Sequence, residues 1–239
     1  MPRYLLPTIF SSIARTTTAT ATATPSPTRW TLLRTLKSEN PNDIQGELHG
    51  TASFTPLHSP SLNTNTITHA TTDATKNPEE RYTDLLYSEE GSLPALPILN
   101  IGPGLRWTKK YIWRLSAEGG ISVWFVKVDK SSTEEEADYL FHEFDLITNN
   151  DTNPNTDKDT DSGGNEFVTP PVPPEVIQGE KTKIIAARGN HLCINDMYRT
   201  AYAFRVDEEN GEVLSWASRH VVRGPKKGQD IVNLYSKGS

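Results

Sequence analysis

The sequence contains a single cysteine, Cys193, and it lacks any long hydrophobic run. One thiol cannot form an intramolecular disulfide or build a zinc finger, so disulfide-stapled and zinc-finger domains are excluded. A chain without disulfides is expected in a reducing compartment. No apolar run approaches the roughly 20 residues that a membrane helix requires, and we therefore expect no membrane partner.

The sequence also has no excess of positive charge, because 24 Lys and Arg stand against 30 Asp and Glu, for a net charge of −6. No basic stripe is interleaved with exposed aromatic residues, so we expect no nucleic-acid partner. Two basic clusters, at residues 106–114 and 219–227, are predicted to be solvated strand faces. A phosphate-bearing small ligand is the alternative for these clusters.

Three segments are poor in apolar residues and rich in Thr, Ser, Asn, Asp and Pro, namely residues 1–28, 58–80 and 148–180. Such segments bury too little apolar surface to offset the entropy of ordering, so we predict a disordered tail and two disordered insertions. The remainder, about 150 residues, is the size of one ordinary domain. We therefore predict a single domain over residues 29–236.

The first 38 residues contain no acidic residue, although Arg and Lys occur among many Ser, Thr and Ala. This composition is typical of a mitochondrial transit peptide. Pro2 and Pro7 weaken the amphipathic helix that such peptides form. A cytoplasmic protein with an inert tail is therefore expected, with mitochondrial import as the alternative.

Residues 104–129 are predicted to form one long β-hairpin. Two runs rich in Trp, Tyr, Ile and Val flank Gly119 and Gly120, and consecutive glycines supply the positive φ of a tight turn. In the first run Tyr111 and Trp113 share one face, whereas Arg106, Lys110 and Arg114 lie on the other. A hairpin cannot bury these aromatic side chains alone, so further strands must close around it.

Further strands are predicted on both sides of this hairpin. Trp30, Leu32 and Arg34 share one face of an early strand, and residues 139–147 alternate so that His142 points with the apolar set. The predicted strands cover residues 30–37, 45–57, 82–91, 104–129, 139–147, 183–187, 191–206 (as one strand or two), 213–222 and 231–235.

Gly189 and Asn190 are predicted to interrupt the chain between two of these strands. No long helix is expected. Sequential antiparallel strands joined mainly by short turns predict an all-β fold, a single up-and-down barrel of about 8–10 strands or a closely related sandwich.

A barrel of this size can hold a small molecule between apolar walls and a few placed polar groups. We predict aromatic walls and a polar set that orients the ligand; the alternative is that the polar residues only satisfy one another as buried ion pairs. The predicted walls are Tyr111, Trp113, Trp124, Tyr198 and Trp216, and the predicted polar groups are Arg34, His142, His191 and Asp196.

The same polar residues admit catalytic interpretations. His142 or His191 with Asp196 would make an acid–base pair, because His titrates near neutrality and Asp fixes its tautomer. His191 and Cys193 share parity on one strand, which permits a nucleophile beside a base, although a lone cysteine in a strand is more often a small core residue. His142, His191 and His220 show no ligand spacing, so no metal ion is predicted.

Seven short motifs occur in order along the chain. They are WTLLR at 30–34, GTASF at 50–54, YSEEG at 87–91, KKYIWR at 109–114, ADYLFHEFDL at 137–146, HLCINDMY at 191–198 and WASRHVVRGPKK at 216–227. This order resembles an uncharacterised family of fungi and bacteria, a domain of unknown function that looks like a calycin-type (lipocalin-like) β-barrel. The resemblance covers residues 30–235 and implies the barrel, but it implies no activity. The positions that match the family pattern are Arg34, Tyr111, Trp113, His142, His191, Cys193, Asp196, Tyr198 and Lys226.

The sequence thus favours a barrel that binds a small, partly apolar ligand in its interior. A haem group is a second hypothesis for the bound molecule, with His142 or His191 as its axial ligand. A hydrolase or isomerase is a third hypothesis, and a non-catalytic interaction module that recruits a partner through the acidic insertion at 148–180 is a fourth. Nothing in the sequence indicates the oligomeric state. The candidate ligand-binding residues are Arg34, Tyr111, Trp113, His142, His191, Cys193, Asp196, Tyr198, Trp216 and Lys226.

Overall fold

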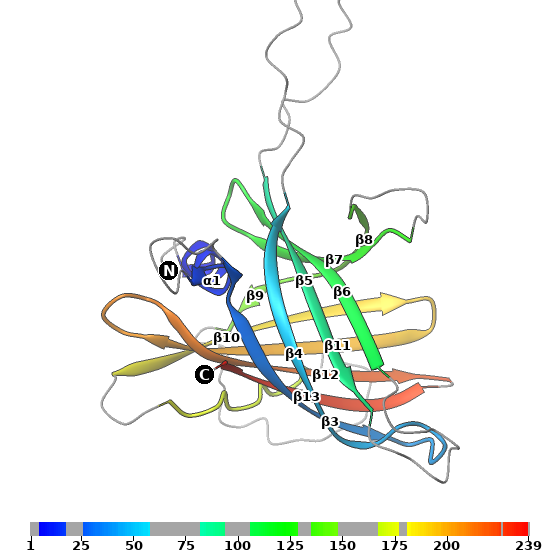
Figure 1. Ribbon diagram of the computed structural model, residues 1–239. Helices are drawn as coiled ribbons and strands as arrows, with labels where there is room; N and C mark the ends of the chain where they lie inside the picture. Colours follow the sequence, from blue (N-terminus) through cyan, green and yellow to red (C-terminus); the bar gives the residue numbers. More distant parts are fainter. Residues whose placement is uncertain are drawn as a thin grey trace, which may run out of the picture.

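The computed structural model is a barrel of antiparallel β-strands with one short helix at its end (Figure 1). Eleven strands form one nearly closed sheet, and two short strands pair separately. The described residues are 5–17, 26–57, 82–93, 106–128, 135–147, 167–176, 181–225 and 227–238. The predicted all-β barrel is confirmed.

The elements follow one another in the order of the chain. They are α1 (Leu5–Ile13), β1 (Thr16–Thr17), β2 (Ser26–Pro27), β3 (Arg29–Ser38), β4 (Gly46–Leu57), β5 (Tyr82–Ser92), β6 (Arg106–Ser116), β7 (Ile121–Val126), β8 (Ala137–Glu143), β9 (Asp145–Leu146), β10 (Thr182–Cys193), β11 (Asp196–Asp207), β12 (Val213–Gly224) and β13 (Lys227–Lys237).

The topology is up-and-down, because each strand from β3 to β8 and from β9 to β13 pairs with its neighbour in sequence. The first and last of these strands, β3 and β13, also pair with each other. The barrel closes between β7 and β10 through the short strands β8 and β9. Strand β8 pairs with β7, and β9, which follows it in sequence, pairs with β10. There the Phe144 N–H donates to Ile121 of β7 and the Ile147 N–H donates to Ala186 of β10.

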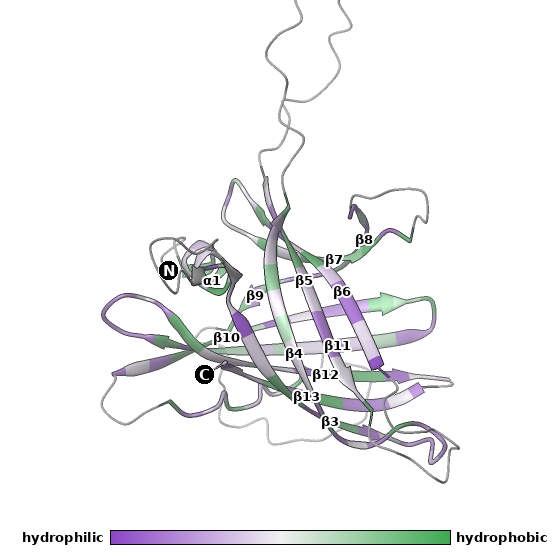
Figure 2. Cartoon of the chain, in the orientation of Figure 1, coloured by the Kyte–Doolittle hydropathy of each residue, from purple (hydrophilic) through white to green (hydrophobic). Residues whose placement is uncertain are grey.

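Alternating side chains build the interior. Trp30 and Leu32 are fully buried and Arg34 is nearly so, as their shared parity predicts. Ala52 and Phe54 of β4 face the same core. Figure 2 shows the resulting mixture of hydrophobic and hydrophilic residues along each strand. An apolar inner face and a polar outer face are what period-two alternation produces in a barrel.

The alternation predicted for residues 139–147 is wrong at one point. Phe141 and His142 are adjacent in sequence, yet both side chains are buried. The pairing of β8 with β7 shifts register between Val123 and Trp124, so the strand carries an irregularity there. Such a bulge turns successive side chains to the same side, which simple alternation cannot anticipate.

The break predicted at Gly189 and Asn190 is also wrong, because β10 continues through both residues. The turn lies instead at Ile194 and Asn195, where Ile194 adopts a positive φ of 56°. A Cβ atom at Gly189 would lie 2.6 Å from the His142 ring. This glycine therefore allows β10 to approach β8 closely, and it does not serve as a turn residue.

Helix α1 lies within the segment for which the sequence predicted a disordered tail. Its residues Ile9, Phe10 and Ile13 are buried in the core at one end of the barrel. Pro7 is in the first helical turn, where a missing N–H is tolerated. No helix within the described ranges is long and apolar enough to span a membrane.

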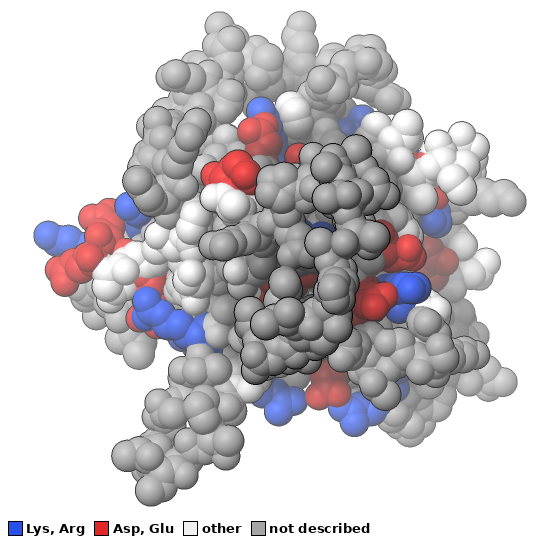
Figure 3. Space-filling model, turned by 90° about the horizontal axis from the view of Figure 1, so that it is seen from above, with Lys and Arg blue, Asp and Glu red and all other residues white. Residues whose placement is uncertain are grey.

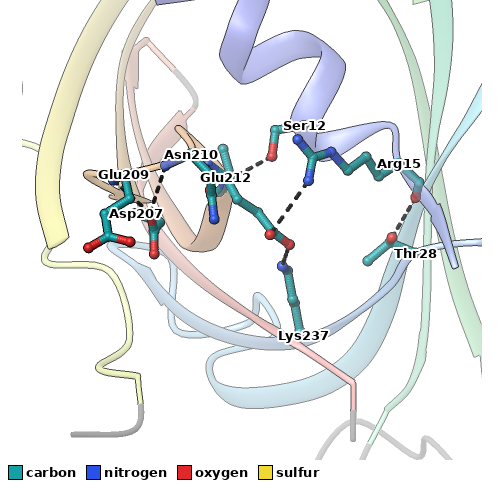
Figure 4. Close-up of polar contacts among 9 residues, drawn as sticks. Ser12, Arg15, Thr28, Asp207, Glu209, Asn210, Glu212 and Lys237 are labelled. Atoms are coloured by element: carbon teal, nitrogen blue, oxygen red, sulfur yellow. Dashed lines mark hydrogen bonds and ion pairs between the residues drawn. The ribbon is translucent and has the colours of Figure 1, made fainter. Parts of the chain in front are cut away.

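Polar contacts hold α1 against the turn between β11 and β12 (Figure 4). The buried Ser12 hydroxyl accepts a hydrogen bond of 2.7 Å from the Val213 N–H. Glu212 lies between Arg15, at 3.5 Å, and Lys237, with which it also pairs. These contacts join the helix and the residues after it to the last two long strands, so α1 is docked against this end of the barrel.

Part of the second predicted insertion is ordered as well. Residues 167–176 lie on the outside of the barrel, where Arg205 donates hydrogen bonds to the carbonyl oxygens of Pro173 and Pro174. The Ser215 hydroxyl donates to Pro174 too. The prediction of disorder is therefore wrong for this stretch. The insertion at 58–80 and residues 148–166 lie outside the described residues.

Candidate functional site

The barrel interior holds a partly open pocket with a volume of about 290 Å³. Its lining includes Tyr198 near the start of β11 and Lys227 at the start of β13, whereas α1 packs at the start of β12. Because neighbouring strands are antiparallel, the pocket lies toward the end opposite α1. The lining residues are Arg34, Tyr87, Glu89, Lys109, Tyr111, Trp113, Val123, Phe125, Phe141, Tyr198, Tyr202, Trp216, Ser218, His220, Val222, Lys227, Gln229, Ile231, Asn233 and Tyr235.

Aromatic rings form the deep wall of the pocket. Trp216 stacks on Tyr235 with ring centroids 3.5 Å apart and planes 3° apart. Trp113 meets Trp216 edge to face at 5.9 Å. Tyr87 contacts both indoles at 6.3 Å. Rings that hold one another in this way present a rigid apolar surface.

A buried ion pair crosses the polar side of the pocket. The Arg34 guanidinium donates to both carboxylate oxygens of Glu89, at 2.7 and 3.0 Å. The Tyr87 hydroxyl donates to the same carboxylate at 2.5 Å, and its oxygen lies 2.8 Å from that of Tyr235. Burial and the adjacent Glu89 charge raise the pKa of Tyr87 well above its ordinary value, so this phenol stays protonated.

The polar chain continues to the opposite strands. Arg34 also donates to the Asn233 side-chain oxygen at 2.7 Å, and the Asn233 amide donates to Ser218 at 2.9 Å. Ser218 in turn lies 3.1 Å from His220 Nε2. Burial lowers the pKa of His220 well below its ordinary value, and the charge of Lys109 lowers it further. His220 is therefore neutral at neutral pH.

A second aromatic group surrounds the mouth of the pocket. Tyr111 and Tyr198 both contact Phe141, at 5.7 Å each. The Lys109 ammonium lies over the Tyr111 ring at 5.2 Å, and the Lys227 ammonium lies over the Tyr198 ring at 5.7 Å. Two lysines thus flank the mouth, each over a tyrosine.

His142 lies behind this wall. Its Nε2 is 3.0 Å from the Tyr202 hydroxyl, and Tyr202 is the residue that reaches the pocket. Burial lowers the pKa of His142 to about 3. The imidazole is therefore neutral, and its role in the structure is to hold Tyr202.

The structure does not place all of the predicted polar residues on the pocket lining. Asp196 forms an ion pair of 2.8 Å with Lys227 and makes no hydrogen bond to a histidine among the described residues. Cys193 faces Asp196 across the end of the β10–β11 hairpin, outside the pocket. Among the described residues, the charge partner of Asp196 is therefore Lys227 and not a histidine. The hydrogen bonds that Lys227 donates to Asp196 and Tyr198 raise the pKa of this lysine.

Neither histidine predicted as an axial ligand lines the pocket, so this cavity does not fit a haem held by His142 or His191. Among the described residues, no group of three His, Cys, Asp or Glu side chains is arranged to hold a metal ion.

The structure sorts the predicted ligand-binding residues into three groups. Trp124 of the predicted walls also lies outside the pocket. Its indole N–H donates to Ser122. Lys226 lies outside the described residues. Those on the pocket lining are Arg34, Tyr111, Trp113, Tyr198 and Trp216, and those away from it are His142, His191, Cys193 and Asp196.

Sequence reasoning missed several lining residues for which a signal was present. Lys109 has the parity of Tyr111, and Glu89 has the parity of Tyr87, so the pattern places both on the inner face. Charged residues are usually exposed, and that rule masks the signal. Ser218, His220 and Asn233 lie on strands far from Arg34 in sequence, and only the closed barrel brings them together.

Comparison with protein families identifies one match. A family of unknown function, DUF6314, matches residues 27–162 and 174–237, which include all the barrel strands. Comparison with curated proteins gives no match. Because the family match covers well over half of the sequence, the chain belongs to DUF6314, a family of unknown function.

Proposed function

We propose that this protein binds a small organic molecule with an aromatic or other flat apolar body inside the barrel. The observation that supports the proposal is the pocket of about 290 Å³ between the Trp113 and Trp216 indoles and the Arg34 network. Pockets for small molecules have volumes of about 300 Å³ and above, and they combine apolar walls with a few polar groups. The volume therefore suits a compound of one or two rings.

The polar groups support binding because they are already held in place. Arg34, Glu89, Asn233 and Ser218 hydrogen-bond to one another, so a ligand meets a preformed surface. Preorganised groups lose little conformational entropy when a ligand binds. The pocket interior is thus suited to a defined orientation of the ligand.

A calycin-type relation is part of this proposal. The up-and-down strand order and an interior pocket, with α1 docked at one end of the barrel, are the features that support it. Barrels of similar strand number hold single small ligands in the same place.

Titration of the full-length protein with two-ring aromatic compounds tests the proposal. The probes are 2-naphthoate, 2-naphthamide and 2-naphthylmethylammonium, and the readout is Trp fluorescence together with calorimetry. Because Trp113 and Trp216 line the pocket, we expect saturable quenching with one bound probe per chain for at least one compound.

Two matched variants locate the binding site. Val222→Phe extends a pocket-lining side chain, whereas Val221→Phe makes the same change on the outer face of β12. Val222→Phe is expected to weaken binding at least about tenfold, or about 1.4 kcal/mol, and Val221→Phe to leave it unchanged. Ile231→Trp is a second filling variant if Val222→Phe does not fold. Absence of binding by all probes, or equal binding in every folded variant, would contradict the proposal.

A further inference from the structure

Charge is unevenly distributed between the pocket and the rest of the protein. The chain has a net charge of −6, yet the pocket lining contains three cations, Arg34, Lys109 and Lys227, and one carboxylate, Glu89. On the face shown in Figure 3, acidic and basic residues lie interspersed. Charges of both signs are therefore mixed on that face, whereas the pocket lining carries more positive than negative groups.

Two of the three cations already have counter-ions. Glu89 is 3% exposed and its two oxygens are engaged by Arg34 and Tyr87. Lys227 pairs with Asp196 at 2.8 Å. Neither carboxylate is close enough to neutralise the third cation as an ion pair.

Lys109 is the cation without such a partner. Within the described part of the chain it makes no ion pair or hydrogen bond, and its ammonium lies over the Tyr111 ring at 5.2 Å. The neighbouring Lys110 points to the outer face and pairs with Glu135 at 2.5 Å. Glu89 lies opposite Lys109 in the pairing of β5 with β6, but its oxygens are already engaged by Arg34 and Tyr87. A lysine at the pocket without an ion pair of its own is positioned for a charge that arrives with the ligand.

A hydrogen-bond donor deeper in the same wall also lacks a partner. Trp216 is 1% exposed, and its indole N–H has no acceptor within the described residues. A buried donor without an acceptor is unfavourable by about 1–3 kcal/mol. Together with Lys109, it is a second donor of the pocket lining that has no acceptor within the described residues.

We infer that the ligand is an anion, an aromatic or similarly flat carboxylate whose apolar body lies against the wall formed by the Trp113 and Trp216 indoles and whose charge is bound by Lys109. This inference rests on the proposed function and specifies its ligand class. A positive charge over an aromatic wall favours a compound with a flat ring and one acidic group, because the ring fills the apolar space while the acid replaces the missing counter-ion.

The naphthyl probes differ mainly in charge, so they separate this inference from the proposed function. We expect 2-naphthoate to bind more tightly than 2-naphthamide, and 2-naphthylmethylammonium to bind most weakly. Lys109→Gln is expected to weaken 2-naphthoate binding roughly 10- to 100-fold, the range for loss of a charged hydrogen bond, and to leave 2-naphthamide binding unchanged. Lys110→Gln is the matched control, with the same loss of charge on the outer face.

Each outcome of the titration is informative. Equal affinity for the acid and the amide, or equal effects of Lys109→Gln and Lys110→Gln, would overturn the anion inference while leaving the pocket as a binding site. Failure of all three probes to bind would instead refute the proposed function itself. Should Lys109→Gln fold poorly, the acid-to-amide affinity ratio of the unmodified protein at low and high NaCl concentration decides: a ratio of one at both salt concentrations contradicts the inference.

Discussion

Arg34 and Glu89 form a buried ion pair, and neighbouring residues make further hydrogen bonds to both side chains. One guanidinium nitrogen of Arg34 contacts both oxygens of Glu89, and Tyr87 and Asn233 give each charged group a further partner. A buried ion pair adds little net stability relative to an apolar pair, but loss of one partner leaves an uncompensated charge. This pair therefore constrains the pocket more than it stabilises the fold.

Replacing one member of this pair is expected to destabilise the protein strongly. Arg34→Met leaves the Glu89 carboxylate buried, and we expect the free energy of unfolding to fall by about 3–5 kcal/mol in urea titrations. The double variant Arg34→Met, Glu89→Gln removes both charges and should recover part of the loss. A double variant as unstable as the single one would contradict the assignment of a buried ion pair.

His142 makes the stability depend on pH. Burial lowers the pKa of the folded imidazole to about 3, below its ordinary value of 6.5. As pH falls from about 6.5 toward about 3, the unfolded chain gains a proton that the folded chain does not bind, so stability decreases.

We expect this histidine to account for about 2 kcal/mol of the stability lost between about pH 7.5 and about pH 5. His142→Gln keeps a donor for Tyr202 and removes the titration, so the variant should lose about that much less over the same range. Urea unfolding at the two pH values measures the difference. Identical losses in both proteins would show that His142 is protonated in the folded state.

Sequence parity predicted which face Arg34 occupies but not its partner. Glu89 is 55 positions away, and two strand registers, β3 on β4 and β4 on β5, bring it to Arg34. Parity fixes one face of one strand, whereas a contact between strands depends on every register between them. The same limit applies to His142 and Asp196, which residue chemistry alone suggested as a pair, whereas in the structure His142 contacts Tyr202 and Asp196 pairs with Lys227.

At the scale of elements, α1 packs against one end of the barrel. Its buried Ser12 hydroxyl accepts from the Val213 N–H, which begins β12. We expect Ser12→Ala to lower the free energy of unfolding by about 1–3 kcal/mol, because the buried N–H loses its acceptor. Ser11→Ala, at an exposed neighbour, should change stability by less than about 0.5 kcal/mol. Equal effects would mean that α1 does not dock as described.

The strength of the local sequence signal explains why the strands were predicted and the helix was missed. The long strands of the barrel carry β-branched and aromatic residues with clear alternation, and these are strong local signals. In α1, Leu5, Leu6, Ile9, Phe10 and Ile13 have the spacing of a helical apolar face, but the Thr- and Ala-rich surroundings suggest a tail. A short helix of this kind is stabilised by packing and not by its own propensity.

For the whole molecule, closure of the barrel determines what the interior can do. Among the described residues, α1 packs at one end and the pocket that reaches the Trp113 and Trp216 indoles lies toward the other. The general plan of an up-and-down barrel followed from strand order and turn signals. The pocket volume did not, because it depends on how the rings pack after closure.

The most direct test of this account is a crystal structure of the protein soaked with 2-naphthoate. The account predicts the ring system against the Trp113 and Trp216 indoles, with the carboxylate within about 3 Å of Lys109, as for a charged hydrogen bond. An interior filled by rearranged side chains, or a probe bound only on the outer surface, would contradict it.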